Sequence, residues 1–209
     1  MSKKLLNGVI KFKEDFFDAH KEIFQDLSSS QNPHTLYIGC SDSRVVPDII
    51  AQTMPGELFV VRNIANMVPP YDENSYSFRC TASIIEYAVN MLEVENIVIC
   101  GHSNCGGCKA LFYPQEKLDK LPSVKQWLKL GEEIKQRVLA KNLSPEEREF
   151  QTEQLNIVKQ LENILTYPFV EERVNNGKLK LYGWYYVIET GDVFNYNFDN
   201  MEFELIEKK

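Results

Sequence analysis

Short apolar segments that alternate with helical segments constrain the fold of this 209-residue chain. Residues 35–39 (TLYIG), 57–63 (ELFVVRN) and 96–101 (NIVICG) are short runs rich in β-branched and aromatic side chains, so each predicts a buried strand. Residues 75–94, between the second and third runs, fit a helix. Strands that alternate with helices predict an α/β fold with a mostly parallel sheet and right-handed connections.

The remaining segments predict further helices and a hairpin. Residues 5–27 carry apolar side chains at helical spacing and predict an N-terminal helical arm. Residues 123–140 and 144–166 predict two more helices, and residues 178–190 and 193–199 predict two strands joined by a tight turn. We therefore expect a mostly parallel central sheet of about four strands, extended by a C-terminal antiparallel strand and flanked by helices.

No linker or internal repeat divides the chain, so we expect a single domain over residues 1–209. We expect it to consist of an N-terminal helical arm, an α/β core that carries the functional site, a helical segment, and C-terminal strands with a tail. These parts cover residues 1–30, 31–112, 113–177 and 178–209, respectively.

The charge and the apolar runs limit the classes of partner. The formal net charge is −7, and the acidic residues do not form one block, whereas nucleic-acid-binding proteins concentrate Lys and Arg on one face. No apolar run approaches the roughly 20 residues of a membrane helix. We therefore expect neither nucleic acid nor a membrane as a partner. Charges near the N-terminus recur too closely for the apolar core of a signal peptide, so we also expect a cytoplasmic location. An odd number of cysteines in a reducing compartment favours metal binding, catalysis or core packing over disulfides; the five are Cys40, Cys80, Cys100, Cys105 and Cys108.

Metal-binding residue types directly follow two of the predicted strands. Cys40 follows the first, and His102 and Cys105 follow the third. Ligands bind beyond the carboxyl ends of strands in open α/β sheets, so these side chains converge if the strands are neighbours. Two thiolates and an imidazole suit zinc, and three protein ligands with an open fourth position are typical of catalytic zinc. Gly106 and Gly107 allow close backbone approach and begin a helix whose N-terminus favours a thiolate.

Asp42 and Arg44 follow Cys40 at alternate positions. If residues 40–44 are extended, the three side chains point the same way. Asp42 would then touch the metal or its bound water, and Arg44 would keep Asp42 ionised. Taken singly, such residues are most often a buried thiol or a solvated ion pair. Their occurrence together, each motif directly after a predicted strand, favours a functional site.

These motifs resemble the signature of the β-class carbonic anhydrases, nearest the plant-type branch. The resemblance covers most of the chain, from about residue 31 to residue 198. The segments that carry it are CSDSR, PGELFVVRNIANMVPPYD, IEYAV, GHSNCGG and GWYYVIETGDVFNYNF.

The resemblance implies a zinc enzyme. One zinc ion (Zn2+) per subunit would be held by Cys40, His102 and Cys105, with Asp42 and Arg44 as a catalytic pair. The implied reaction is the reversible hydration of carbon dioxide to bicarbonate and a proton, a lyase activity, by attack of zinc-bound hydroxide that the pair orients. In some members of the family the aspartate itself is the fourth zinc ligand in a closed, inactive form at lower pH.

The resemblance also implies a substrate pocket and an assembly. In the plant-type branch the glutamine, phenylalanine and tyrosine of the pocket lie near a dimer boundary, so a homodimer or a dimer of dimers is implied, with N-terminal helices wrapped around the partner and joined sheets. A second branch has a regulatory anion site, but its tryptophan is replaced here by Tyr37, so we do not expect that site, although Arg62 matches its arginine. The implied pocket residues are Gln31, Phe59, Ile64 (usually valine), Tyr87 and Gly106.

Two alternatives remain open from the residues alone. Cys105 and Cys108 have the C-x-x-C spacing of a thiol redox protein, although this leaves His102, Asp42 and Arg44 without a role. A zinc-stabilised binding module without catalysis would result if the metal were permanently closed. Zinc content measured together with carbon dioxide hydration across pH distinguishes these alternatives from the enzyme.

Overall fold

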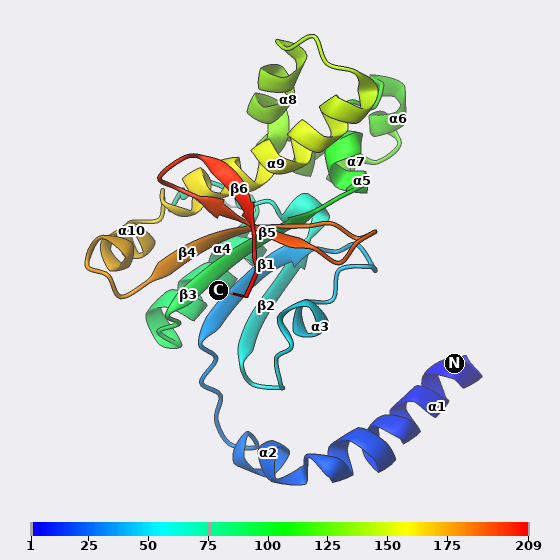
Figure 1. Cartoon of the computed structure of the whole chain (residues 1–209), viewed down its shortest axis with the longest axis vertical. Coiled ribbons are helices and arrows are strands. Elements are labelled where there is room, and N and C mark those ends of the chain that lie inside the picture. Colours follow the sequence, from blue (N-terminus) through cyan, green and yellow to red (C-terminus); the bar gives the residue numbers. More distant parts are fainter. Residues whose placement is uncertain (1, 75–76, 209) are drawn as a thin grey trace.

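The structure, a computed structural model, describes residues 2–74 and 77–208. A six-stranded sheet with the strand order β2-β1-β3-β4-β5-β6 forms its centre (Figure 1). The first four strands in this order are parallel, and the last two are antiparallel. The parallel sheet with a C-terminal antiparallel extension is therefore as predicted. In sheet order the strands are β2 (Leu58–Asn63), β1 (Thr35–Cys40), β3 (Asn96–His102), β4 (Lys180–Tyr186), β5 (Val193–Asn197) and β6 (Glu202–Leu205).

Strand β6 is the strand that the sequence does not predict. It lies in a polar C-terminal tail and pairs with β5, with Phe203 opposite Tyr196 and Leu205 opposite Phe194. Local pattern is a weak predictor for such a strand, because the pairing partner supplies its stability.

Helices flank the sheet, and within the described ranges none combines the length and the apolarity needed to cross a membrane. The helix predicted over residues 75–94 begins at Arg79, and residues 75 and 76 lie outside the described residues. The α-helices are α1 (Lys3–Lys11), α2 (Lys21–Asp26), α3 (Pro47–Ala51), α4 (Arg79–Glu86), α5 (Gly106–Ala110), α6 (Gln115–Asp119), α7 (Pro122–Leu128), α8 (Glu132–Leu139), α9 (Pro145–Ile164) and α10 (Pro168–Asn175). Shorter segments are π-helical (Phe12–Phe17, Tyr87–Met91) or 3-10 (Ile64–Asn66, Lys129–Gly131).

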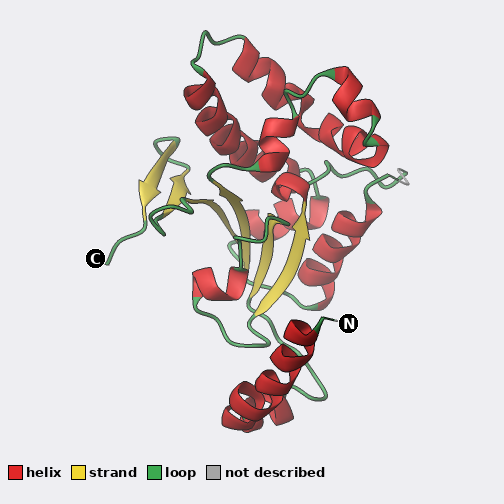
Figure 2. Ribbon diagram, turned by 90° about the vertical axis from the view of Figure 1, so that its right-hand side faces the viewer, coloured by secondary structure: helices red, strands yellow, loops and turns green. Residues whose placement is uncertain are grey.

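Alternate residues of the strands form two cores. Leu36 and Ile38 of β1 pack with buried residues of α4 and α9 on one face of the twisted sheet (Figure 2). Tyr37, between them, packs on the other face with Val98 and Trp184. This two-residue alternation is that of a strand buried on both faces.

Two glycines allow helix α9 to lie directly against β3 and β4. A Cβ atom on Gly101 would lie 2.7 Å from Cγ1 of Ile157, and one on Gly183 would lie 2.8 Å from Cδ1 of Leu161. Any larger residue would push the helix away from the sheet. This close packing places α9 next to the carboxyl end of β3, where the predicted site lies.

Helix α9 also holds the loop that follows β2. The side-chain amide of Asn156 donates to the carbonyl of Ala65, and that of Asn163 donates to the carbonyl of Val68, both at 2.8 Å. The N–H of Val68 donates to the side chain of Gln160 at 2.8 Å. These buried amides satisfy backbone groups that water does not reach.

The N-terminal arm, residues 3–26, extends away from the rest of the molecule (Figure 1). Its junction with the body is tight, since a Cβ atom on Gly56 would lie 2.7 Å from Leu27. Along the arm, 66% of Val9 and 52% of Ile10 are exposed. The arm therefore presents an apolar face that the described part of this chain does not cover.

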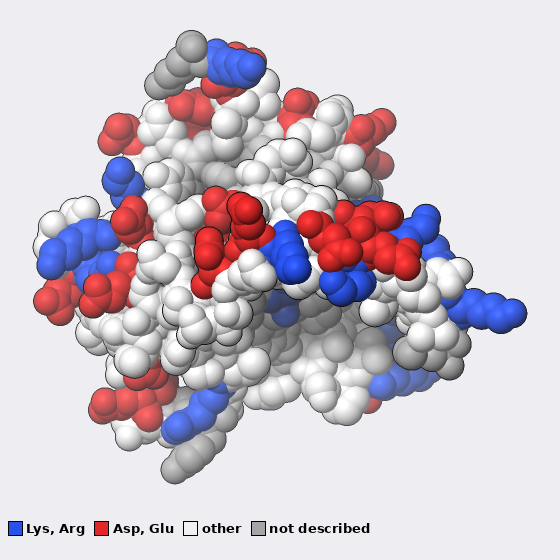
Figure 3. Space-filling model, turned by 90° about the horizontal axis from the view of Figure 1, so that it is seen from below, with Lys and Arg blue, Asp and Glu red and all other residues white. Residues whose placement is uncertain are grey.

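Charges of both signs are interspersed on the surface seen from below (Figure 3). Uncharged areas lie between them on that face.

Candidate metal centre

Cys40, His102 and Cys105 meet at the carboxyl ends of β1 and β3, which are parallel neighbours. Their ligand atoms all lie within 4.8 Å of one another. The two Sγ atoms are 4.0 Å apart, and all three side chains are buried. The side chains that the sequence predicts to converge therefore do so, and we call them the metal group.

One nitrogen of His102 is left without a hydrogen bond within the part of the chain that the structure describes and could ligate a metal ion. The imidazole Nδ1 of His102 lies 2.9 Å from the carbonyl oxygen of Ser103 and donates to it. Its Nε2 is buried and has no hydrogen-bond partner among the described residues. Leaving a buried nitrogen unpaired is costly. Ligation of a metal would satisfy it, and one nitrogen with two sulfurs is a donor set that zinc prefers.

The protein environment by itself favours protonated thiols in the metal group. The facing Cys105 thiol and burial raise the pKa of Cys40 to about 12. The pKa of Cys105 is raised as well, first by the Cys108 thiol. Ligation by thiolates therefore requires a cation that displaces these protons.

Asp42 and Arg44 form an ion pair with two contacts at the rim of the metal group. Nε of Arg44 donates to Oδ1 of Asp42 at 2.9 Å, and Nη2 donates to Oδ2 at 2.7 Å. The Arg44 guanidinium holds the pKa of the Asp42 carboxyl well below its usual range. Oδ2 of Asp42 is 4.0 Å from Nε2 of His102, so an ionised carboxylate faces the metal group.

The prediction that residues 40–44 are extended is wrong, because strand β1 ends at Cys40 and the chain then turns. The N–H of Val45 donates to the carbonyl of Asp42 at 3.0 Å, so the chain turns there. The backbone N–H of Arg44 caps the same turn by donating to Oδ1 of Asp42 at 3.0 Å. The pairing predicted from alternate positions is thus made by a turn, because the aspartate side chain bonds the backbone two residues on.

Arg62 of β2 supports the turn from the other side. Its Nε donates to the carbonyl of Cys40 at 2.9 Å, and its Nη2 donates to the carbonyl of Asp42 at 2.6 Å. Arg44 also donates to the carbonyl of Asn104 at 3.1 Å, which joins this turn to the one that carries Cys105. Two arginines therefore fix the backbone around the metal group.

Glu153 and Tyr185 are site residues that sequence reasoning missed. Oε1 of Glu153 accepts the backbone N–H of Cys105 at 2.8 Å, and Oε2 accepts the hydroxyl of Tyr185 at 2.8 Å. Burial raises the pKa of Glu153 to about 7. The available signal was a charged residue at position 153, four residues before Ile157, on the buried side of a predicted helix.

Ile64 and Gly106 lie near the metal group. A Cβ atom on Gly107 would lie 2.9 Å from Cγ2 of Ile64 and 2.8 Å from Cβ of Ala65, so close approach requires glycine at position 107. A Cβ atom on Gly106 would meet nothing within 4 Å. Ile64 is 40% exposed. This side of the metal group is therefore apolar and open.

Phe59, Tyr87 and Gln31 are not brought to the metal group within one chain. The rings of Phe59 and Tyr87 stack with centroids 5.9 Å apart. Phe59 pairs with Leu36, four positions before Cys40, which is about 13 Å along the strand. Gln31 is exposed in the segment before β1. One chain thus assembles only part of the predicted pocket.

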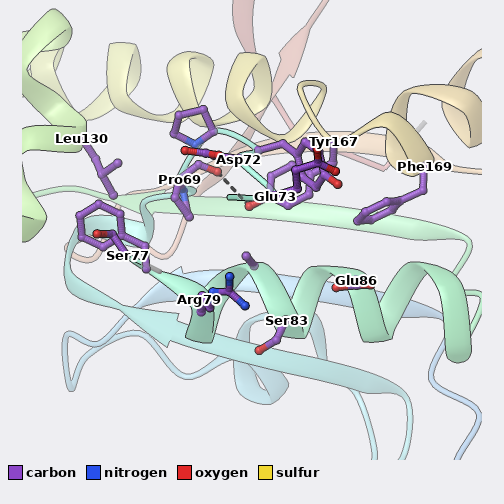
Figure 4. Close-up of a pocket in the computed structure, with 14 residues that line it drawn as sticks. Pro69, Asp72, Glu73, Ser77, Arg79, Ser83, Glu86, Leu130, Tyr167 and Phe169 are labelled. Atoms are coloured by element: carbon purple, nitrogen blue, oxygen red, sulfur yellow. Dashed lines mark hydrogen bonds between the residues drawn. The ribbon is translucent and has the colours of Figure 1, made fainter. Parts of the chain in front are cut away.

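A cavity of about 450 Å3 lies apart from the metal group, between the loop over residues 69–73 and helix α4 (Figure 4). Asp72, Glu73, Glu86 and Arg79 are among its lining residues, and no member of the metal group is. This cavity therefore does not belong to the predicted catalytic site.

Known proteins of one family are similar to this chain over most of its length. The carbonic anhydrase family matches residues 35–193. A carbonic anhydrase of Helicobacter pylori (strain J99) is 43% identical over 209 residues, covering 96% of this chain and 93% of its own. The chloroplastic β carbonic anhydrase 5 of Arabidopsis thaliana is 38% identical over 179 residues, covering 85% and 57%, respectively.

A solved structure shares the fold. The β-carbonic anhydrase CcaA superposes with a TM-score of 0.92 at 38% identity, covering 99% of this chain and 92% of that one. The matched family region contains the metal group, Asp42 and Arg44. The sequence match, the shared fold and the cluster of two cysteines and a histidine lead to one conclusion: this chain belongs to the β-class carbonic anhydrases.

Proposed function

We propose that this chain catalyses the zinc-dependent, reversible hydration of carbon dioxide to bicarbonate and a proton. The observation that carries the proposal is the buried metal group beside an ionised carboxylate. The residues that would hold one Zn2+ per subunit are Cys40, His102 through Nε2, and Cys105. Zinc bound there supplies a Lewis acid that lowers the pKa of water toward about 7.

Asp42 and Arg44 orient the attacking water in this proposal. Arg44 keeps Asp42 ionised at neutral pH, so the carboxylate can only accept hydrogen bonds. By accepting one from the water, Asp42 directs the oxygen lone pair toward carbon dioxide. The contacts of Arg44 with both carboxylate oxygens also hold Asp42 away from the fourth ligand position. If that ion pair opened, Asp42 would become the fourth ligand of a closed form.

We also propose that the working unit is a homodimer, or a dimer of such dimers. Edge strand β2 and the apolar face of the N-terminal arm support this, because each offers a surface for a second copy. Gln31, Phe59 and Tyr87 would then reach a pocket that also contains Ile64 and Gly106. The apolar side chains suit carbon dioxide, and the Gln31 amide can donate to a substrate oxygen.

The proposal extends to the chain as a whole. Residues 1–209 would form one carbonic anhydrase domain, with the arm, core, helical segment and C-terminal strands predicted above. A cytoplasmic location suits the site, because the two thiol ligands must remain reduced.

Zinc analysis combined with stopped-flow carbon dioxide hydration across pH tests the function. We expect one zinc per chain and activity that rises with pH. The variants Cys40→Ala, His102→Ala and Cys105→Ala should lose zinc and activity together. Full zinc in all three would overturn the ligand assignment. Zinc without hydration at any pH would indicate a binding module, and neither zinc nor hydration would favour the thiol redox protein.

A further inference from the structure

A buried carboxyl group lies directly behind the metal group and has no part in the mechanism above. Only 2% of Glu153 is exposed. Burying a carboxyl group is unfavourable unless hydrogen bonds compensate. Both of its oxygens are used: Oε1 accepts the N–H of Cys105 and Oε2 accepts the hydroxyl of Tyr185, each at 2.8 Å. Glu153 therefore joins helix α9 to a metal-group residue and to strand β4.

The two contacts suit a carboxyl group, because each of its oxygens can accept one of them. Glu153 lies on the same side of α9 as the buried amides of Asn156, Gln160 and Asn163, which bond the loop after β2. Those positions face a mixture of donors and acceptors. Glu153 faces two donors, and a carboxylate has an acceptor oxygen for each, whereas an amide has only one.

The turn that Glu153 contacts is tight and needs support. Asn104 has φ +57°, in the left-handed region that a non-glycine residue seldom adopts. Cys105 follows in an extended conformation and is the N-cap of α5. Such backbone conformations persist when surrounding contacts fix them. The Glu153 carboxyl fixes the Cys105 amide, and Arg44 fixes the Asn104 carbonyl.

Tyr185 links Glu153 to the strand that neighbours His102, the second ligand on this side of the metal group. It lies opposite Gly101 in the β3–β4 register, one residue before His102. The path from Tyr185 through Glu153 to Cys105 therefore spans the turn between the two ligands, His102 and Cys105. The close contact of α9 with Gly101 fixes the distance between the helix that carries Glu153 and strand β3.

We propose that Glu153 is a positioning residue of the metal centre: it holds the Cys105 amide against strand β4 and thereby directs the Cys105 sulfur toward Cys40 and His102. The inference rests on the zinc site of the proposed function. Hydrogen-bond partners that orient metal ligands typically change metal affinity by about 10- to 100-fold when they are removed.

The rate of zinc loss to a chromophoric chelator, 4-(2-pyridylazo)resorcinol, tests this role in the full chain. Glu153→Ala should release zinc about 10- to 100-fold faster than the natural protein. Glu153→Gln keeps one oxygen for the Cys105 amide and should largely restore the slow rate. Tyr185→Phe removes the second donor to the carboxyl and should give an intermediate rate. In the cobalt-substituted protein, the sulfur-to-cobalt charge-transfer band should shift in Glu153→Ala.

Thr152→Val is the matched control. Thr152 is also buried on α9, and its hydroxyl bonds only the carbonyl of Arg148, at 2.6 Å, among the contacts of the described residues. This variant should lose stability without any change in the zinc release rate or in the cobalt spectrum. A merely structural role for Glu153 would give its variants the same behaviour as Thr152→Val.

Two results would overturn the positioning role. One is a folded Glu153→Ala protein with the natural zinc release rate and cobalt band. If that variant does not fold, a natural zinc release rate in Tyr185→Phe overturns the role instead, because this variant is expected to release zinc faster. Failure of the proposed function is distinguishable, because the natural chain would then bind no zinc or would bind it without hydrating carbon dioxide, before any variant is compared.

Discussion

Asp42 shows how a single residue acquires its role from its neighbours. Its carboxylate lies 4.0 Å from Nε2 of His102, and both of its oxygens are held by Arg44. Its backbone carbonyl is held by Arg62. Arg44 thus sets the charge and the orientation of this carboxylate, and Arg62 fixes the backbone that carries it.

Asp42→Asn tests the role of that charge. The amide has nearly the same size, so we expect zinc to be retained, but the uncharged side chain no longer acts as an acceptor-only partner for water. The carbon dioxide hydration rate should fall about 100-fold or more, as measured by stopped flow with zinc content determined in parallel. Asp119→Asn, at an exposed ion pair with Lys125, is the control and should keep full activity. Near-natural hydration by Asp42→Asn would exclude the role.

Site residues could be predicted from the sequence where a local pattern places them, and not where a distant part of the chain does. The positions of Cys40, His102 and Cys105 could be predicted, because each directly follows a strand and parallel strands end at one edge. Glu153 could not be, because its partner Cys105 is 48 residues away and the contact depends on how α9 packs. The role of Arg62 likewise depends on its distance from the turn, which only the folded sheet provides.

At the scale of elements, helix α9 connects the sheet to the site. Its apolar side chains pack on the strands, and its buried polar side chains bond the loops that end β2 and β3. The helix begins at Pro145, at the start of the predicted range 144–166, because Ser144 and Glu147 form a capping box. Its start was thus encoded locally, whereas its contacts with the loops were not.

Gly101→Ala tests the close packing of this helix. The added Cβ would lie 2.7 Å from Ile157, so helix or strand must move. We expect a loss of about 1–3 kcal/mol in the free energy of unfolding, as for other overpacked cores, measured by urea denaturation. Zinc release should also become faster, because Glu153 is displaced with the helix. The double variant Gly101→Ala/Ile157→Ala should recover the slower release, and a single variant as stable as the natural protein would contradict the tight contact.

Glu147→Gln tests the capping box through pH. The backbone N–H of Ser144 lowers the pKa of Glu147 below its usual value. The native state therefore binds fewer protons, so this contribution to stability is present above the unfolded pKa of about 4.3 and is lost as the pH falls below it. The stability difference between natural protein and variant should shrink from pH 6 to pH 3 in urea denaturation.

Ser144→Ala provides the comparison for that experiment. It removes the uncharged half of the same capping box and should cost about 1 kcal/mol at pH 6. A Glu147→Gln difference that stayed constant down to pH 3 would show that the carboxylate does not stabilise the helix start.

For the molecule as a whole, the surfaces left open by one chain predict its assembly. Stable interfaces bury about 800 Å2 on each partner, and the exposed apolar face of the arm and edge strand β2 are two surfaces that a second copy could cover. The arm could be predicted from helical spacing alone. Its direction away from the body could not, because the sequence does not say whether an apolar face packs within its own chain or against another.

Deletion of residues 1–27 tests the assembly. We expect a monomer by light scattering that retains zinc, since no member of the metal group lies in the deleted segment. Hydration activity should fall about tenfold or more, because loss of even 1.4 kcal/mol of substrate contact has that effect. A natural protein that is monomeric and fully active would contradict a pocket completed by a second copy.

The separation of the two sulfur ligands along the chain has a consequence for folding kinetics. Cys40 and Cys105 are 65 residues apart, and β2 and α4 lie between them. Zinc bound to both sulfurs would stabilise the native state, in which this segment is closed into a loop. The sulfurs meet only after β1 and β3 have paired, so the metal bonds form late on the folding path. Removal of zinc should therefore raise the unfolding rate more than it lowers the folding rate.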